Sequence, residues 1–120
     1  MVTSTYALRV STLLVPLIGM IDSQRAEQIT DTLLRAAQDQ RATTILLDVT
    51  GVSLIDTHVA GLLVRLAHML RLLGARTALV GIRPEIAQSI VGLGIDLSGL
   101  SSYASLMTAL AAMRWERTAR

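Results

Sequence analysis

Hydrophobic and polar positions change their period several times along the chain, and each change predicts a new element. Two short β-type segments come first, an edge strand over residues 5–10 and a second strand over 13–18 after a turn at Ser11 and Thr12. Asp22 and Ser23 are typical N-cap residues, and apolar positions follow them at three- and four-residue spacing. This predicted helix face consists of Ala26, Ile29, Thr30, Leu33, Ala36 and Ala37.

The middle of the chain predicts a buried strand, a short loop and a long helix. Apart from Asp48, residues 43–49 are a run of β-branched residues and leucine, which is typical of a strand covered on both faces. A short loop through Leu54 and Ile55 then leads into a helix over residues 56–73, which Gly74 ends as a C-cap. The inward positions of that helix are Val59, Leu62, Leu63, Leu66, Leu70 and Leu73.

The last third repeats the alternation of strand and helix. We expect a buried strand over residues 77–80, a turn at Gly81, and a helix over 84–93 that starts at Pro84 and is closed by Gly94. A short strand or bend over 95–97 and a final helix, from Tyr103 or Ser105 to about residue 117, complete the chain. The order β-β-α-β-α-β-α-(β)-α predicts an α/β fold, with a mostly parallel or mixed sheet of four to five strands and about four helices.

Composition agrees with one compact domain. The chain has 120 residues, of which 52% are hydrophobic and 17% charged, so we expect a single domain over 1–120 with its core at about 5–113 and a tail at 114–120. Because there is no cysteine, disulfides and thiolate chemistry are excluded. No apolar run reaches the roughly 18 residues of a membrane span, and the first residues do not resemble a signal peptide. We expect a cytoplasmic protein without a membrane partner.

The charge pattern argues against nucleic-acid binding. The net charge is +2, and all 11 basic residues are arginines. They are scattered along the chain, apart from Arg114, Arg117 and Arg120 near the C-terminus, and aromatic residues do not alternate with them.

Few residues could support catalysis or hold a metal. His58 and His68 lie ten residues apart on one predicted helix, too far to bind one ion together, and we expect no metal and no cofactor. Asp48 and Asp56 both fall near the end of a predicted strand and could form a carboxylate pair for acid–base work or Mg²⁺. The simpler interpretation makes Asp56 a helix N-cap and Asp48 the acceptor that closes a loop.

Thr57 carries the most distinctive hydroxyl of the sequence. It follows Asp56 in the predicted first turn of a long helix, where backbone N–H groups lack partners and the helix dipole favours negative charge. A phosphate would be tolerated there. From the residues alone, Thr57 is either a capping hydroxyl or a phosphorylated switch.

Five ordered segments carry a family resemblance that extends over about residues 5–113. They are residues 14–23 (LVPLIGMIDS), 47–52 (LDVTGV), 55–57 (IDT), 79–88 (LVGIRPEIAQ) and 93–97 (LGIDL). In these segments the chain resembles the STAS family of anti-sigma-factor antagonists and stressosome scaffolds, especially proteins of the RsbR and RsbS types.

The resemblance implies a non-catalytic signalling scaffold in the general stress response. It implies that a GHKL-type Ser/Thr protein kinase, similar to RsbT, phosphorylates Thr57, and that Ser89 is a second acceptor. Asp56, Thr57, His58 and Gly61 would form the partner-binding surface. The other implied partners are RsbR- and RsbS-like STAS proteins, in a homo- or hetero-oligomer. Met69 and Leu72 could add an apolar strip that meets another subunit or a neighbouring element of the same domain.

The family resemblance also leaves an alternative. STAS-like domains serve as accessory parts of membrane transporters, both anion transporters and lipid ABC transporters, where no phosphorylation is required.

Overall fold

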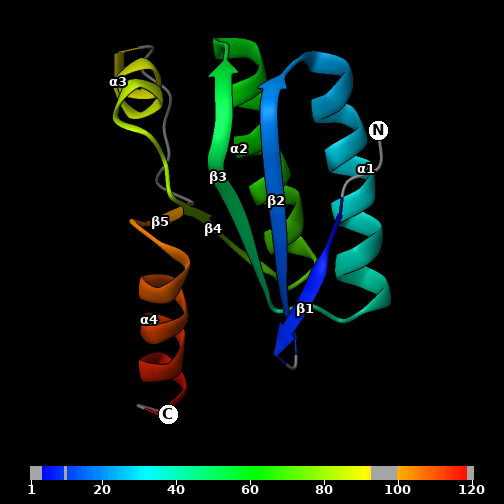
Figure 1. Ribbon diagram of the computed structural model, residues 1–120. Helices are drawn as coiled ribbons and strands as arrows, with labels where there is room; N and C mark the ends of the chain where they lie inside the picture. The colour runs from blue at the N-terminus through cyan, green and yellow to red at the C-terminus, as the bar shows by residue number, and fades with distance from the viewer. Residues whose placement is uncertain (1–3, 10, 93–99, 119–120) are drawn as a thin grey trace.

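The computed structural model describes residues 4–9, 11–92 and 100–118, and gives the backbone alone for residues 7–9, Thr57, Ser89 and 113–118. In this part of the chain, five strands and four helices follow one another (Figure 1). They are β1 (Tyr6–Arg9), β2 (Thr12–Ile21), α1 (Ser23–Asp39), β3 (Thr44–Ile55), α2 (Thr57–Leu72), β4 (Arg76–Val80), α3 (Pro84–Gly92), β5 (Ser101–Tyr103) and α4 (Leu106–Thr118).

The strands form one sheet in the order β1-β2-β3-β4-β5. Strand β1 pairs with β2 in the antiparallel direction, after a turn in which Ser11 has a φ of 72°. The pairs β2–β3, β3–β4 and β4–β5 are parallel. The predicted α/β class and mostly parallel sheet are therefore confirmed.

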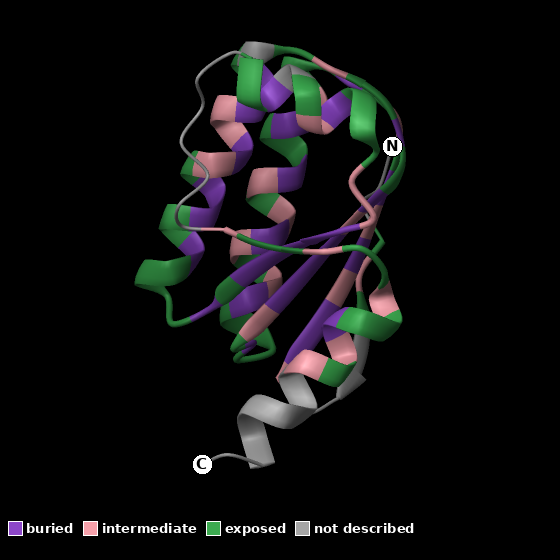
Figure 2. Ribbon diagram, turned by 90° about the vertical axis from the view of Figure 1, so that its left-hand side faces the viewer, coloured by how far each residue is buried: buried purple, intermediate pink, exposed green. Residues whose placement is uncertain are grey.

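Helices cover the two faces of the sheet unequally. The larger core joins α1 and α2 to one face, where Val15, Ile29, Ile45 and Leu66 are fully buried. On the other face, α4 packs Ala109 against Leu46 and Val80 in a smaller core. Figure 2 shows the buried residues concentrated where the helices meet the sheet.

Strands β2 and β3 are longer than the sequence predicts, and the loop expected through Leu54 and Ile55 is wrong, because both residues belong to β3. Strand β3 continues to Ile55 because β2 also continues to Ile21, so that each supplies backbone partners for the other. Pairing resumes at Ile18 and Gly51 after a shift in register, and a second shift follows Gly19. Such irregularities interrupt the alternation of polar and apolar residues, so the sequence pattern does not predict the full length of the two strands.

The helix ends agree with the predicted signals in most cases. Gly74, with a φ of 90°, follows α2, and Pro84 is the first residue of α3. Leu73 does not face inward as expected, because α2 stops at Leu72 and Leu73 is its exposed C-cap. The possible strand over 95–97 and the predicted helix end at Leu93 and Gly94 lie outside the described residues.

The last helix, α4, begins directly after Ser105, which was one of its two predicted starts, and not at Tyr103, which was the other. Tyr103 belongs to β5, which the sequence did not predict, because its backbone pairs with Val80 of β4. The Ser105 hydroxyl accepts a hydrogen bond from the Thr108 N–H at 3.2 Å, so Ser105 caps α4.

Candidate functional site

The first turns of α1 and α2 lie side by side at one edge of the sheet. Ile21 and Ile55 are register partners at the ends of β2 and β3, and each is followed directly by an aspartate and a helix. Asp22 and Asp56 therefore have equivalent places at the carboxyl ends of two parallel strands, the edge where open α/β sheets commonly bind ligands and partners.

Asp56 is the N-cap of α2, as predicted. Its Oδ1 accepts a hydrogen bond from the Val59 N–H at 2.8 Å, and its carbonyl oxygen accepts one from the Ala60 N–H at 2.9 Å. The extended backbone of Asp56, with φ −96° and ψ 174°, is the usual N-cap conformation. Thr57 is consequently the first residue of the helix, where N–H groups have no intrahelical acceptor.

The other residues predicted for the site lie on the same helix. His58 is exposed, and Gly61 is one turn after Thr57, so it shares a helix face with the threonine. A Cβ atom on Gly61 would meet nothing within 4 Å, so packing does not require a glycine there. The side chains of Thr57 and Ser89 lie outside the described part of the structure, and Ser89 belongs to α3 next to the buried Ile90.

The structure excludes Asp48 and Asp56 as a carboxylate pair. Residues 49–55 are extended in β3, where each residue adds 3.2–3.4 Å along the strand. Asp48 and Asp56 therefore lie about 25 Å apart. Asp48 instead accepts a hydrogen bond from the Thr50 N–H at 3.0 Å, the local acceptor role that the sequence suggested. His58 and His68 are both exposed and stand nearly three turns apart on α2. The described residues contain no cluster of three or more histidine, aspartate or glutamate residues that could hold a metal.

An exposed apolar surface adjoins the site, and sequence reasoning missed it. Ile18, Met20 and Leu54 are 66%, 58% and 57% exposed, and Met20 is the register partner of Leu54. We call these three residues the bare sheet end. The buried Leu17 and Ile21 face α1 and α2, so the alternation along β2 directs Ile18 and Met20 to the opposite face, beyond the core that α4 makes. The pattern of polar and apolar residues does not reveal this surface, because β2 is apolar at positions for both faces.

Arg25 of α1 secures the backbone of the bare sheet end. Its Nη1 donates hydrogen bonds to the carbonyl oxygens of Ile18 and, at 3.4 Å, of Met20. Between them, Gly19 has a φ of 83°, which favours glycine. The guanidinium thus binds carbonyl groups where the pairing of β2 with β3 is irregular.

Comparison with known proteins identifies the family. The model of the STAS domain family matches residues 6–109, and the chain belongs to this family. One relative is the RsbT co-antagonist protein RsbRA of Bacillus subtilis (strain 168), which is 49% identical over 83 residues. The match covers 69% of this chain but 30% of the relative, so the chain spans less than a third of that protein's length.

Solved structures share the fold over nearly the whole chain. A variant of RsbS from Moorella thermoacetica matches with a TM-score of 0.82 at 21% identity, covering 97% of both chains. A protein from the structure titled "Molecular architecture of the stressosome, a signal integration and transduction hub" matches with a TM-score of 0.73 at 20% identity, covering 98% of this chain and 99% of that one. No helix among the described residues is long and apolar enough to cross a membrane.

Proposed function

We propose that this chain is a non-catalytic scaffold of the RsbR and RsbS type, and that phosphorylation of Thr57 controls its binding to a partner kinase. The observation that carries the proposal is the position of Thr57 as first residue of α2, directly after the Asp56 cap. The RsbT co-antagonist among its relatives supports an RsbT-like GHKL-type Ser/Thr kinase as the partner, and the stressosome likeness supports assembly with other STAS proteins. We propose the cytoplasm as the location of this assembly.

A phosphate on Thr57 would act mainly on the interface with the partner. It would add about −1.5 to −2 charges and three acceptor oxygens. Because a helix N-terminus stabilises negative charge, the domain would keep its fold. A docked partner would meet this new charge beside the Asp56 carboxylate, and like charges forced together at an interface cost several kcal/mol. Phosphorylation would thereby release the partner.

The surface around Thr57 offers room for a protein partner. Gly61 leaves open space one turn along α2, and His58 is exposed beside Thr57. The bare sheet end lies at the same edge of the sheet, since Leu54 is two residues before Asp56. We propose that the kinase contacts Asp56, Thr57, His58 and Gly61, and that its footprint extends to the bare sheet end. Ser89 of α3 is proposed as a second phosphorylation site.

Phosphorylation by the cognate kinase tests this function. The chain is incubated with ATP and the RsbT-type kinase of its own organism, and the products are mapped by phosphopeptide mass spectrometry. We expect phosphate on Thr57, loss of that label in Thr57→Ala, and release of the kinase from the phosphorylated protein. The Thr57→Ala protein should fold, bind the kinase and resist release, and Thr57→Asp should weaken binding without any kinase reaction.

Ser23 provides a matched control for this experiment. It is the first residue of α1, is exposed, and follows the N-cap Asp22 as Thr57 follows Asp56. A Ser23→Ala protein should be labelled like the wild type, whereas Ser89→Ala should lose only the second label. If Thr57→Ala is labelled as fully as the wild type, the switch is wrongly assigned. Co-purification with a membrane transporter instead of a large STAS assembly would favour the accessory-subunit alternative.

A further inference from the structure

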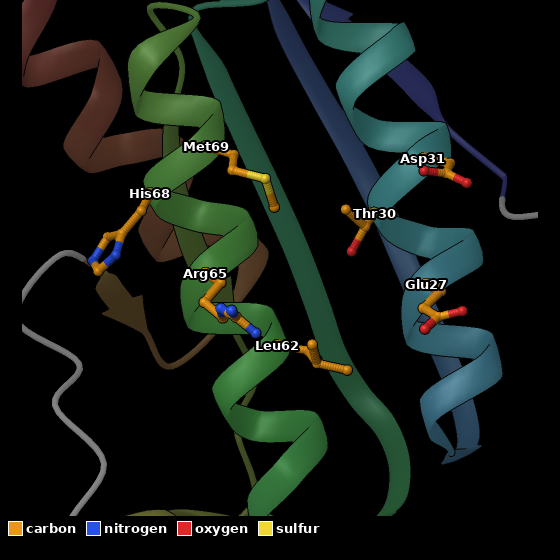
Figure 3. A pocket seen from close by; sticks show the side chains of 7 residues that line it. All are labelled: Glu27, Thr30, Asp31, Leu62, Arg65, His68 and Met69. Carbon is orange, nitrogen blue, oxygen red and sulfur yellow. The ribbon is translucent and has the colours of Figure 1, made fainter.

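A polar pocket lies on the side of α2 that is turned away from α1. In Figure 3, Leu62 and Met69 point from α2 toward α1, whereas His68 points in the opposite direction. On that side His68 lines a pocket of about 340 Å³ between α2, the start of β4 and the start of β5. We call it the α2–β5 pocket. Its walls are formed by Ala67, His68 and Arg71 of α2 and by residues 75–77 and 100–101.

Arg71 gives the α2–β5 pocket a positive charge. Its side chain is exposed in the last turn of α2, and Arg76 lines the neighbouring wall. Within the described part of the chain, no acidic residue lines the pocket. The C-terminal end of a helix carries only about half a negative charge, so the full charge of Arg71 exceeds it. The pocket therefore favours an anion.

A buried hydroxyl group without a partner belongs to the inner wall of the pocket. Thr77 is 5% exposed, and among the described residues its Oγ1 has no hydrogen-bond partner. Thr77 is the register partner of Ile45 and shares with Leu79 the sheet face that packs against α2. Because buried hydroxyl groups are nearly always hydrogen-bonded, this oxygen indicates a ligand that enters the pocket.

The remaining lining supplies further donors and an apolar wall. His68 on α2 and Ser101 on β5 are exposed, and an imidazole N–H and a hydroxyl group can both donate hydrogen bonds. Ala67 and Ala75 are buried and Leu100 is half-buried, so this part of the wall is apolar. The pocket thus combines donors for an oxyanion with a surface for an organic group.

We propose that the α2–β5 pocket binds a small phosphate monoester. The phosphate would accept hydrogen bonds from Arg71 and Thr77, and the organic group would lie against Leu100. Three terminal oxygens can accept from the guanidinium and from several further donors at once, whereas a carboxylate has only two oxygens. The volume of about 340 Å³ is near the lower limit of small-molecule sites, so a helix or strand of another protein would not fit.

This site is separate from the proposed phosphorylation switch. Thr57 is the first residue of α2 and Arg71 is in its last turn, so about 21 Å separates them at 1.5 Å per residue. The pocket lies where β4 and β5 start, whereas Thr57 follows the end of β3. The inference therefore goes beyond the proposed scaffold function and stands independently of it.

NMR titration of the ¹⁵N-labelled protein tests the site with three probes: phenyl phosphate, inorganic phosphate and phenol. We expect saturable amide shifts with phenyl phosphate, confined to residues 67–77 and 100–101, with a dissociation constant of about 1 mM or lower. Phenol should not bind, because it lacks the phosphate. Inorganic phosphate should bind at least about threefold more weakly, because it lacks the group that would contact Leu100.

Two substitutions separate binding from stability. Arg71→Gln should raise the dissociation constant for phenyl phosphate at least about tenfold, because a charged donor is lost. Thr77→Val should raise it about three- to tenfold, but it should not lower the free energy of unfolding, because the hydroxyl group has no partner in the free protein. Arg65→Gln, an exposed change on the same helix outside the pocket, should bind like the wild type. Urea denaturation confirms that every variant is folded.

Four results would overturn the proposal: no saturable shift up to about 20 mM phenyl phosphate, shifts centred elsewhere, equal effects of Arg71→Gln and Arg65→Gln, or wild-type affinity of Thr77→Val. Binding of phenol, or equal affinity for inorganic phosphate and phenyl phosphate, would overturn the assignment to an ester. Thr57→Ala should bind phenyl phosphate like the wild type. A failure of kinase labelling at Thr57 would thus leave the titration result unaffected, and the reverse also holds.

Discussion

Gly81 and Thr50 approach each other so closely that a Cβ atom on Gly81 would lie 2.0 Å from the Thr50 Oγ1 and 3.2 Å from the Thr50 Cβ. Gly81 also has a φ of 72°, and its N–H donates a hydrogen bond to the Tyr103 carbonyl oxygen at 3.0 Å. The turn after β4 is therefore held against β3 and β5 at the edge of the sheet that contains the candidate site.

Gly81→Ala should lower the free energy of unfolding by about 2–4 kcal/mol, the sum of left-handed backbone strain and steric overlap. Urea denaturation measures the change. Adding Thr50→Ala should recover part of the loss, because it removes the nearest atom but not the strain. Gly92→Ala is the control, since a Cβ atom there would meet nothing within 4 Å and should cost little. Equal effects at Gly81 and Gly92 would contradict this account.

Asp22 and Asp56 are equivalent N-caps, so substituting each in turn distinguishes an effect on stability from an effect on partner binding. Asp22→Ala and Asp56→Ala should each lower the free energy of unfolding by about 1 kcal/mol, because each removes the acceptor of an N–H in the first turn. Thermal or urea denaturation checks both. Only Asp56→Ala should reduce labelling of Thr57 by the kinase. If Asp22→Ala reduces labelling equally, the effect arises from stability and not from the α2 surface.

Substitutions of Gly61 test whether a partner contacts the start of α2. Gly61→Ala should raise the free energy of unfolding by up to about 1 kcal/mol, because alanine favours a helix and the space around it is open. Gly61→Trp should leave the fold intact but weaken kinase binding at least about tenfold, because its bulk would fill the proposed interface. Calorimetric titration with the kinase measures this. Leu72→Trp, at a position that is 87% exposed near the other end of α2, should bind like the wild type.

Arg25 should stabilise the end of β2. Arg25→Ala should lower the free energy of unfolding by about 1 kcal/mol, because the carbonyl groups of Ile18 and Met20 lose a charged donor. Amide hydrogen exchange should increase over residues 18–21 in particular. Arg35→Ala, an exposed change on the same helix, is the control and should alter neither measurement. Unchanged exchange in Arg25→Ala would show that the sheet itself holds this segment.

The bare sheet end should matter for binding and not for folding. Leu54→Glu should change the free energy of unfolding by no more than about 0.5 kcal/mol, because the side chain is 57% exposed. Its affinity for the kinase should fall, because a carboxylate would replace apolar contact area. Leu72→Glu provides the matched control. Wild-type affinity of Leu54→Glu would place the bare sheet end outside the kinase footprint.

Local signals in the sequence were sufficient to predict most elements. Asp22 and Asp56 begin helices, Gly74 follows the end of one, and Pro84 starts another, because caps and breakers act on backbone groups within about four residues. The burial of positions such as Ile29 and Leu66 followed from helical periodicity in the same way.

Other features depend on pairing between distant segments and could be seen only in three dimensions. The extension of β3 to Ile55 requires the parallel partner β2, and this extension separates Asp48 from Asp56. Whether an apolar residue is covered depends on where another element packs, so Leu14 lies against the core that α4 makes whereas Met20 is exposed.

The sequence by itself thus determined the order of the elements, their caps and the position of Thr57 at the start of α2. The tertiary structure decided which helix ends lie together and which sheet face remains bare. The physical reason is that capping and periodicity are local, whereas strand register and exposure are set by contacts between residues far apart in the chain.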